Sequence, residues 1–215
     1  LDATFTPSVL AVAPEIQTNG QVVAAEANTF AQIYGITHDY LDVRNFEIHN
    51  GMFISPAHVT NGSRVAVLGS EVTKTLYGTR DPVGQTIRLN QRVFTVIGGL
   101  ESKGGRDDNR VLVPITAAAE RLTRQRTGQG GVNIQTITVK AVGADSVDEA
   151  MAEVTTLLRI RHRITDVDDF TIANQQDALD TLNETNETFA LFLGAIAGIS
   201  LLVGGIGIMN IMLVS

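Results

Sequence analysis

The chain of 215 residues contains no cysteine and no tryptophan, and aromatic residues make up only 5% of it. Without cysteine, the protein cannot bind zinc through thiolates or use a cysteine nucleophile. A domain of this size buries enough apolar surface to fold without disulfides, so their absence is compatible with a location outside the cytoplasm. The few aromatic side chains provide no extended stacking surface for sugars or bases.

Basic residues are also scarce. The chain has 16 Lys and Arg against 23 Asp and Glu, which gives a net charge of −7. Because nucleic acid binding depends on basic side chains that neutralise phosphates, this balance disfavours a nucleic acid partner. It equally disfavours docking onto an anionic lipid surface.

No charged side chain occurs in residues 190–215. As a helix that rises ~1.5 Å per residue, this segment would be roughly 39 Å long. The hydrocarbon core of a bilayer is ~30 Å thick, so the segment is long enough to cross it with some tilt. The sequence therefore predicts an acidic domain followed by a transmembrane helix.

The flank of this segment indicates on which side of the membrane the domain lies. Residues 164–189 contain no Lys or Arg but several Asp and Glu. Cytoplasmic flanks of membrane helices are enriched in basic residues, so we predict that residues 1–189 lie on the outer side. The chain begins with Leu1 and has no basic–apolar leader. We therefore expect a signal peptide or an earlier membrane helix upstream in the gene product.

Apolar periodicity and turn residues predict a mixed α/β domain. The expected strands are 9–13, 21–27, 31–36, 64–69, 85–90, 92–97, 111–115, 136–141 and 170–173. The expected helices are a turn at 38–43 and the segments 70–76, 116–124 and 147–163. Turns are predicted at Asn19-Gly20 and at 49–51, and a hairpin around Asn90-Gln91. The last helix, between two strands, forms a βαβ-like unit.

A new helical pattern begins at Asp177. Its apolar seam contains Leu179, Leu182, Asn186, Phe189 and Leu193, which follow one another at steps of three and four. No glycine or proline interrupts it before Gly194, so we predict one continuous helix, a stalk joined rigidly to the membrane span. Asn186 could fix the register between two stalks, as a buried Asn does in coiled coils, or it could face solvent.

Small and polar residues mark the membrane half of this helix. Gly194 and Gly198 form a small-xxx-small motif that lets membrane helices approach closely, although glycine is common in such helices in any case. The predicted packing set is Gly194, Gly198, Gly204, Gly205, Gly207 and Asn210. Asn210 could bond across helices or lie near the interface; the sequence favours neither.

The sequence contains no recognisable catalytic, cofactor or metal constellation. None of the four histidines, His38, His49, His58 and His162, lies four residues from another. The acidic group from Asp166 to Asp169 lacks the glycine and the distant Glu of a calcium loop, so we interpret it as a solvated loop. Ser70 is not part of a Gly-x-Ser-x-Gly elbow. We therefore expect the chain to be non-catalytic.

Three sets of motifs resemble a known family. The first is Tyr34-Gly-Ile-Thr with Tyr40-Leu-Asp-Val-Arg-Asn and Gly51-Met-Phe; the second is Arg64-Val-Ala-Val-Leu-Gly with Asp81-Pro-Val-Gly-Gln-Thr-Ile and Phe94-Thr-Val-Ile-Gly. The third, and most specific, is Leu201-Leu-Val-Gly-Gly-Ile-Gly-Ile-Met-Asn-Ile-Met-Leu-Val-Ser. Together they resemble the periplasmic core domain and the start of the FtsX-like permease region of MacB-type ABC transporter permeases.

This resemblance implies an α+β fold in which one α/β subdomain is inserted in another, before a transmembrane helix. The expected boundaries are 1–55 and 132–175 for the two halves of the core subdomain, 56–131 for the insertion, 176–189 for the stalk and 190–215 for the span. The loops 102–110 and 125–131 in the insertion are candidate contact surfaces, because they are polar and contain glycine.

The resemblance also implies a function. Such permeases lie in the bacterial cytoplasmic membrane, dimerise, and transmit ATP-driven movement to their outer domains for extrusion of macrolides, peptides or lipoproteins. The implied partners are an ATP-binding subunit or domain, a second permease copy and, in some members, a MacA-like membrane-fusion protein. No cofactor is expected in this chain, since ATP and Mg²⁺ would bind at the partner ATPase. The alternative is a ligand-sensing or hydrolase-regulating ectodomain of a membrane signalling protein, whose span would lack the third motif.

Overall fold

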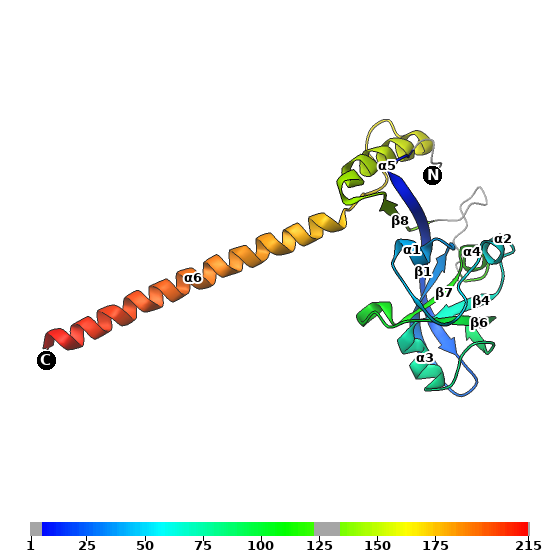
Figure 1. Ribbon diagram of the computed structural model, residues 1–215, viewed down its shortest axis with the longest axis horizontal. Helices are drawn as coiled ribbons and strands as arrows, with labels where there is room; N and C mark the ends of the chain where they lie inside the picture. The colour runs from blue at the N-terminus through cyan, green and yellow to red at the C-terminus, as the bar shows by residue number, and fades with distance from the viewer. Residues whose placement is uncertain (1–5, 123–133, 215) are drawn as a thin grey trace. The chain divides into compact units, whose positions relative to one another are not determined.

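The computed structural model describes residues 6–122 and 134–214, except for the side chains of 175–180, 207, 210, 211, 213 and 214 (Figure 1). The strands are β1 Val9–Val23, β2 Asn28–Ile36, β3 Ile48–Gly51, β4 Val65–Leu68, β5 Thr86–Leu89, β6 Arg92–Leu100, β7 Arg110–Pro114 and β8 Thr136–Ala141. The α-helices are α1 Tyr40–Val43, α2 Pro56–Thr60, α3 Ser70–Tyr77, α4 Ile115–Arg121, α5 Val147–His162 and α6 Gln175–Val214. Short 3₁₀ helices occupy Gly105–Asp107 and Ala144–Ser146. The predicted mixed α/β fold with a C-terminal helix is confirmed. The chain divides into two compact units, Leu1–Glu153 and Val154–Ser215.

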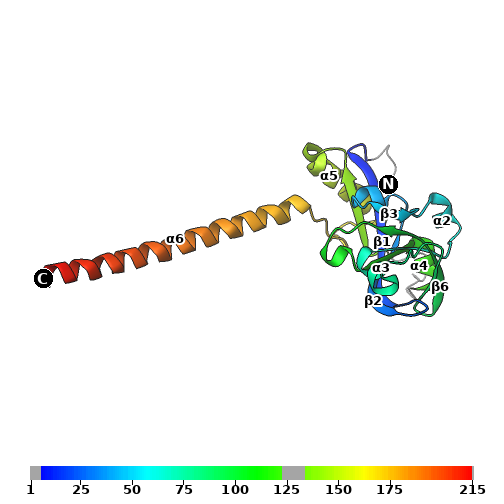
Figure 2. The ribbon, with the colours of Figure 1, turned by 60° about the horizontal axis from the view of Figure 1, so that its bottom comes forward.

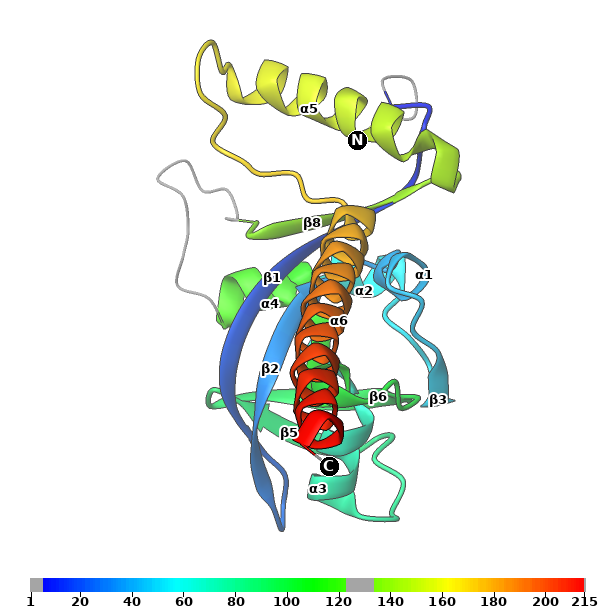
Figure 3. The ribbon, with the colours of Figure 1, turned by 90° about the vertical axis from the view of Figure 1, so that its left-hand side faces the viewer.

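The strands of the first unit join into one sheet that closes on itself. Their order is β2-β7-β4-β6-β5-β1-β8, and β1 also pairs with β2. The first part of β1 pairs with β8, from Val9↔Ala141 to Glu15↔Thr136. Its second part pairs with β2, from Ile16↔Gly35 to Val23↔Asn28. Figure 3 shows β1 as a long curved ribbon that runs beside β2 and continues past it to β8.

Alternating residues of the strands enter two apolar clusters, as the period of two in a strand requires. Ile33 of β2, Leu68 of β4 and Phe94 of β6 belong to the larger cluster, to which α3 and α4 also contribute. Tyr34 and Val67, each next in sequence to one of these residues, belong to the second cluster. The sheet is therefore buried on both faces around its central strands.

Two turn predictions were wrong. The chain does not turn at Asn19-Gly20, because β1 runs through both residues, and the turn follows at residues 24–27, where the Ala24 N–H donates to the Ala27 carbonyl at 2.9 Å. Gly20 has a different role: a Cβ there would lie 2.3 Å from Asn90 Oδ1, so glycine permits the close approach of the β5–β6 hairpin. The turn predicted at residues 49–51 is part of β3, which pairs with β6.

The hairpin predicted around Asn90-Gln91 is confirmed. Leu89 pairs with Arg92, and Asn90 and Gln91 have φ values of 47° and 70°. Positive φ at both central residues is the geometry of a type I′ turn, whose twist matches that of the flanking strands.

The strand predicted at residues 170–173 is wrong. These residues lie outside the sheet, and Phe170 instead contacts His162 of α5 edge to face, with ring centroids 6.3 Å apart. In the described part of the chain, the βαβ-like unit therefore lacks its second strand. The boundaries proposed for the two subdomains, the stalk and the span stay predictions.

Candidate functional site

The strongest candidate for a functional element is α6. It forms one uninterrupted helix of 40 residues, Gln175–Val214, which confirms the predicted continuity (Figures 1 and 2). At ~1.5 Å per residue it is about 60 Å long, twice the thickness of a bilayer core. Its several glycines do not break it, because a helix that satisfies all its backbone groups internally is the favoured state in lipid.

The surface of α6 is that of a membrane helix. Residues Thr181–Ile206 have a mean hydropathy of 2.3, and none of this window is buried against the rest of the described protein. Leu201, for example, is 81% exposed. An apolar surface this large is unstable in water, so its natural surroundings are lipid or another apolar helix. α6 is thus a candidate membrane span, and its apolar window overlaps the predicted span 190–215.

The predicted stalk residues lie on the N-terminal part of α6, where Leu182, Asn186 and Phe189 fall within the apolar window Thr181–Ile206. Leu182, Asn186 and Phe189 are exposed, and the side chain of Leu179 lies outside the described residues. At about 100° per residue, these positions fall within a stripe roughly 80° wide. The same stripe continues through Leu193 into small residues, including Ala197, Ser200 and Gly204. A single face therefore changes from large to small side chains where the helix becomes uniformly apolar.

The backbone of the predicted packing glycines is accessible to another helix. A Cβ at Gly194, Gly198, Gly204 or Gly205 would meet no described atom within 4 Å. Such positions allow another helix to approach closely, which is the physical basis of small-residue packing in membranes. Gly207 and the side chain of Asn210 lie outside the described residues. The stalk set and the packing set both stay predictions.

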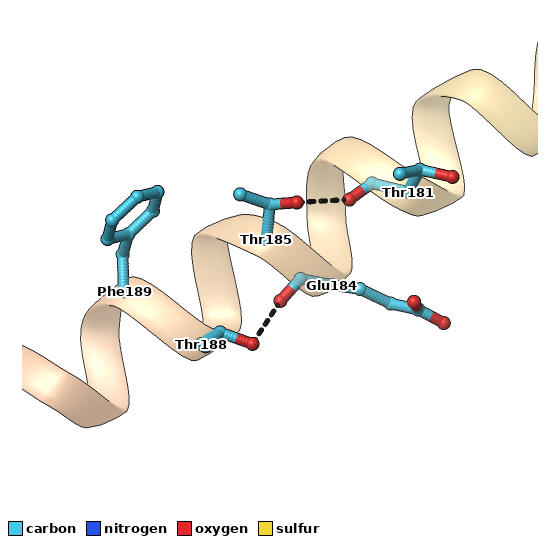
Figure 4. A pocket seen from close by; sticks show the side chains of 5 residues that line it. All are labelled: Thr181, Glu184, Thr185, Thr188 and Phe189. Carbon is cyan, nitrogen blue, oxygen red and sulfur yellow. Dashed lines mark hydrogen bonds between the residues drawn. The ribbon is translucent and has the colours of Figure 1, made fainter.

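Figure 4 shows a shallow hollow on α6 lined by Thr181, Glu184, Thr185, Thr188 and Phe189. Thr185 Oγ1 donates to the Thr181 carbonyl at 2.8 Å, and Thr188 Oγ1 donates to the Glu184 carbonyl at 2.9 Å. These bonds satisfy the hydroxyls within the helix, so both threonines can face an apolar partner at little cost. Because all the lining residues come from one helix, the hollow is relief on the helix surface and not an enclosed binding site.

A buried polar cluster ties together distant segments of the first unit. Arg110, at the start of β7, is 2% exposed. Its Nη1 donates to Tyr40 Oη of α1 at 2.9 Å, and its Nη2 pairs with Asp107. Its guanidinium lies 4.9 Å from the ring centroids of both Tyr34 and Phe46. Burial raises the pKa of Tyr40, so its hydroxyl stays neutral and accepts the bond from Arg110.

Asp108 organises the loop at residues 102–110, which from the sequence was described only as polar and containing glycine. Its carboxylate accepts bonds from Ser102 Oγ at 2.6 Å and from the N–H groups of Lys103 at 2.8 Å and Gly104 at 3.1 Å. Burial opposes ionisation of Asp108, but these hydrogen bonds outweigh it and lower its pKa below the ordinary value. Residues 102–110 are thus wound around one ionised side chain. The loop at 125–131 lies outside the described residues.

Sequence reasoning missed this cluster, since it placed Arg110 in the loop. The sequence held one signal for this cluster, which is a basic residue, Arg110, directly before an apolar strand. Among the side chains that the structure describes, no group of three His, Cys, Asp or Glu residues is placed to hold a metal ion. Arg110 binds Tyr40 and Asp107, and Asp108 binds its own loop, so these contacts fix segments of the first unit together.

Comparison with known proteins agrees with this architecture. A family model described as MacB-like periplasmic core domain matches residues 1–157. The macrolide export ATP-binding/permease protein MacB of Rhodospirillum rubrum is 38% identical over 212 residues, covering 95% of this chain and 31% of the relative. The pyoverdine export ATP-binding/permease protein PvdT of Pseudomonas entomophila is 34% identical over 217 residues, covering 97% and 32%. The chain thus spans about a third of the length of these curated relatives.

Solved structures show the same fold. The periplasmic region of MacB from Actinobacillus actinomycetemcomitans has a TM-score of 0.69 at 24% identity and covers 85% of this chain and 83% of its own. The extracellular domain of the noncanonic ABC-type transporter YknZ from Gram-positive bacteria has a TM-score of 0.63 at 19% identity, covering 74% and 80%.

Proposed function

Because the chain belongs to the MacB-like periplasmic core domain family, we propose that it transmits ATP-driven movement across the membrane as part of an exporting ABC transporter permease. In this role, residues 1–189 lie on the periplasmic side of the bacterial cytoplasmic membrane and α6 enters the bilayer. The single observation that carries the proposal is the unbroken α6, with its long apolar surface.

A continuous helix is suited to mechanical coupling. A rigid rod passes a shift or rotation of one end to the other without local bending, whereas a flexible tether would absorb it. The stripe from Leu182 to Phe189 would pair with a second copy outside the membrane, and the small residues beyond Gly194 would pack within it. Both sets of positions belong to one helix, so a rotation of the stalk also turns the residues within the membrane.

The proposed partners follow from the relatives. Proteins named as ATP-binding/permease proteins combine both activities, so we assign ATP and Mg²⁺ to a domain outside this chain and no catalysis to the chain itself. A second permease copy and a MacA-like membrane-fusion protein complete the assembly. The proposed substrate is of the macrolide, peptide or lipoprotein type. One relative is named for macrolide export, and another is named for pyoverdine export. We do not propose the sensor alternative, because nothing in these relatives favours it.

The experiment that tests this function is disulfide crosslinking in the full-length protein in membranes. The chain contains no cysteine, so each introduced thiol is unique within it. Single cysteines replace Leu182, Asn186 or Phe189. Glu184→Cys is the matched control, since it lies on the opposite face of the helix at about 100° per residue.

We expect crosslinks between copies at the three seam positions and none at the control. Trapping the ATP-bound state should change their yield, because the stalks then move relative to each other. Crosslinks that form equally at Glu184, or that ignore nucleotide, would overturn the mechanical role and leave α6 as a plain anchor.

A further inference from the structure

The connection from α5 to α6 begins with a sharp reversal of the chain at Arg163. Its N–H donates to the Ile160 carbonyl at 3.3 Å, and the Ile164 N–H donates to the Arg159 carbonyl at 2.9 Å. This pair of bonds is the Schellman arrangement, which requires a left-handed residue after the helix cap. Arg163 has a φ of 56°. The position usually belongs to glycine, so an arginine there is strained.

Two acidic residues then bring the connection back to the helix it has just left. Asp168 binds Arg159 through both carboxylate oxygens, with Nε–Oδ1 at 2.6 Å and Nη2–Oδ2 at 3.2 Å. Asp169 lies 2.9 and 3.0 Å from His162 Nδ1. Both basic partners are in the last turn of α5, where the helix dipole also favours positive charge. The acidic loop predicted to be merely solvated is therefore bound to α5.

These contacts close a loop that is easily opened. The two ion pairs are between partly exposed side chains, and exposed pairs contribute little individually. The strain at Arg163 opposes the closed form, whereas the bidentate geometry of Arg159 with Asp168 favours it. Each of these terms is small, so the two ion pairs alone hold the closed form only weakly.

We propose that residues 159–170 form a reversal clasp, which holds slack in the connection between α5 and α6 and releases it under load. When the clasp is closed, residues 163–170 stay folded back on the last turn of α5. When it opens, residues 164–169 can span up to roughly 20 Å at ~3.3 Å per residue. The clasp therefore controls how much of a movement of one helix reaches the other. The force that would open the clasp comes from the transport movement, so this part of the inference rests on the proposed function; the closed arrangement of residues 159–170 does not.

A charge swap tests the clasp directly. Arg159→Glu and Asp168→Arg each break the bidentate pair, and the double variant restores it with reversed charge. Hydrogen exchange of the full-length protein in nanodiscs reads the amides of Arg163 and Ile164, which bond only when the reversal is closed. We expect each single variant to exchange up to about five times faster, as loss of an exposed ion pair allows, and the double variant to recover most of that change.

Two further variants sharpen the result. Arg163→Gly removes the strain without touching an ion pair, so exchange should become slower than in the wild type. Arg161→Glu is the control: it reverses a charge in the same turn, and Arg161 makes no ion pair within the described residues. Equal effects of Arg161→Glu and Arg159→Glu, or no recovery in the double variant, would overturn the clasp.

Export by the same variants tests the link to transport. We expect export to follow the order of clasp closure, reduced in both single variants and restored in the double. If hydrogen exchange changes in the single variants and recovers in the double variant but export is unchanged, release of slack under load is refuted. The proposed function would fail by a different result, namely stalk crosslinks whose yield does not depend on nucleotide.

Discussion

Large apolar side chains are placed in opposite ways in the closed sheet and in α6. Leu68, Phe94 and Leu112 of the sheet are fully buried, whereas Phe192 and Met212 of α6 are 65% and 78% exposed. The residue types are the same, and only the surroundings differ. The sheet closes on itself and supplies its own apolar partner, whereas α6 takes its partner from the membrane or from another helix.

Polar groups show the same contrast. In the sheet unit, Arg110 Nη1 donates to Tyr40, which is 70 residues away in the sequence, and Asp108 accepts hydrogen bonds from its own loop. On α6, Thr185 and Thr188 are satisfied by carbonyls one turn earlier on the same helix. A folded core can offer polar partners from elsewhere, but an isolated helix in lipid must provide them itself. The comparison leads to four predictions, from the largest expected effect to the smallest.

Truncation of a phenylalanine should affect the free energy of unfolding very differently in the sheet and in α6. Phe94→Ala leaves a cavity in the larger apolar cluster and should lower the free energy of unfolding by about 3–5 kcal/mol. Phe192→Ala, on the exposed surface of α6, should leave unfolding of the sheet unit unchanged. Urea denaturation of both variants in detergent, followed by circular dichroism, measures the difference. Equal losses would mean that α6 packs against the sheet and is not a separate apolar surface.

An introduced positive charge should hinder membrane insertion in the predicted span of α6 but not in its stalk. Leu202→Arg places a cation near the middle of the predicted span and should cost about 2.5–3.5 kcal/mol of insertion. Leu182→Arg, in the stalk, should insert almost normally because its charge can reach water. Membrane fractionation with a topology reporter compares them. If both variants insert equally well, the span has been placed wrongly.

Removing the buried guanidinium should weaken the sheet unit. Arg110→Met breaks the charged hydrogen bond to Tyr40 and the pair with Asp107, and should cost about 2 kcal/mol of unfolding free energy. Arg88→Met, at an exposed position of β5, is the control and should change stability by less than about 0.5 kcal/mol. Thermal denaturation of the two variants gives the answer. A loss no larger than that of the control would show that the cluster does not stabilise the fold.

The smallest predicted effect is that of Asp108→Asn, at about 1–2 kcal/mol near neutral pH. The pKa of Asp108 is lowered in the folded state, so its contribution is fully present above its ordinary pKa of 3.8 and is lost as the pH falls through the lower pKa of the folded state. The stability difference from the wild type should therefore shrink in acid. Asp148→Asn, on the exposed start of α5, is the control and should change stability by less than about 0.5 kcal/mol at neutral pH. A constant difference at every pH would contradict the account.

The sequence was most informative where one local pattern decides the structure. The uninterrupted seam from Leu182 to Leu193 predicted a continuous helix, because no helix breaker intervenes. Asn90-Gln91 predicted a hairpin because both flanking stretches alternate. In each case neighbouring residues supply the whole signal, so no distant contact has to be known.

The sequence predictions failed where contacts with residues distant in the sequence determine the local structure. Gly20 is glycine because the β5–β6 hairpin approaches it, and nothing near it in the sequence says so. Phe170 and Ile172 alternate like a strand, yet Phe170 packs on His162. The reversal at Arg163 has no glycine to mark it, so the pairing of Asp168 with Arg159 was not foreseen.

The central claim is that α6 transmits movement as one rigid rod. The most direct test is to insert alanines between Phe189 and Ala190 in the full-length protein and to measure export. Two inserted residues rotate the stalk by about 200° relative to the span, whereas seven return it to within about 20° of its original phase. We predict that export is lost with two residues and largely restored with seven. Export that is indifferent to the number inserted would contradict the account.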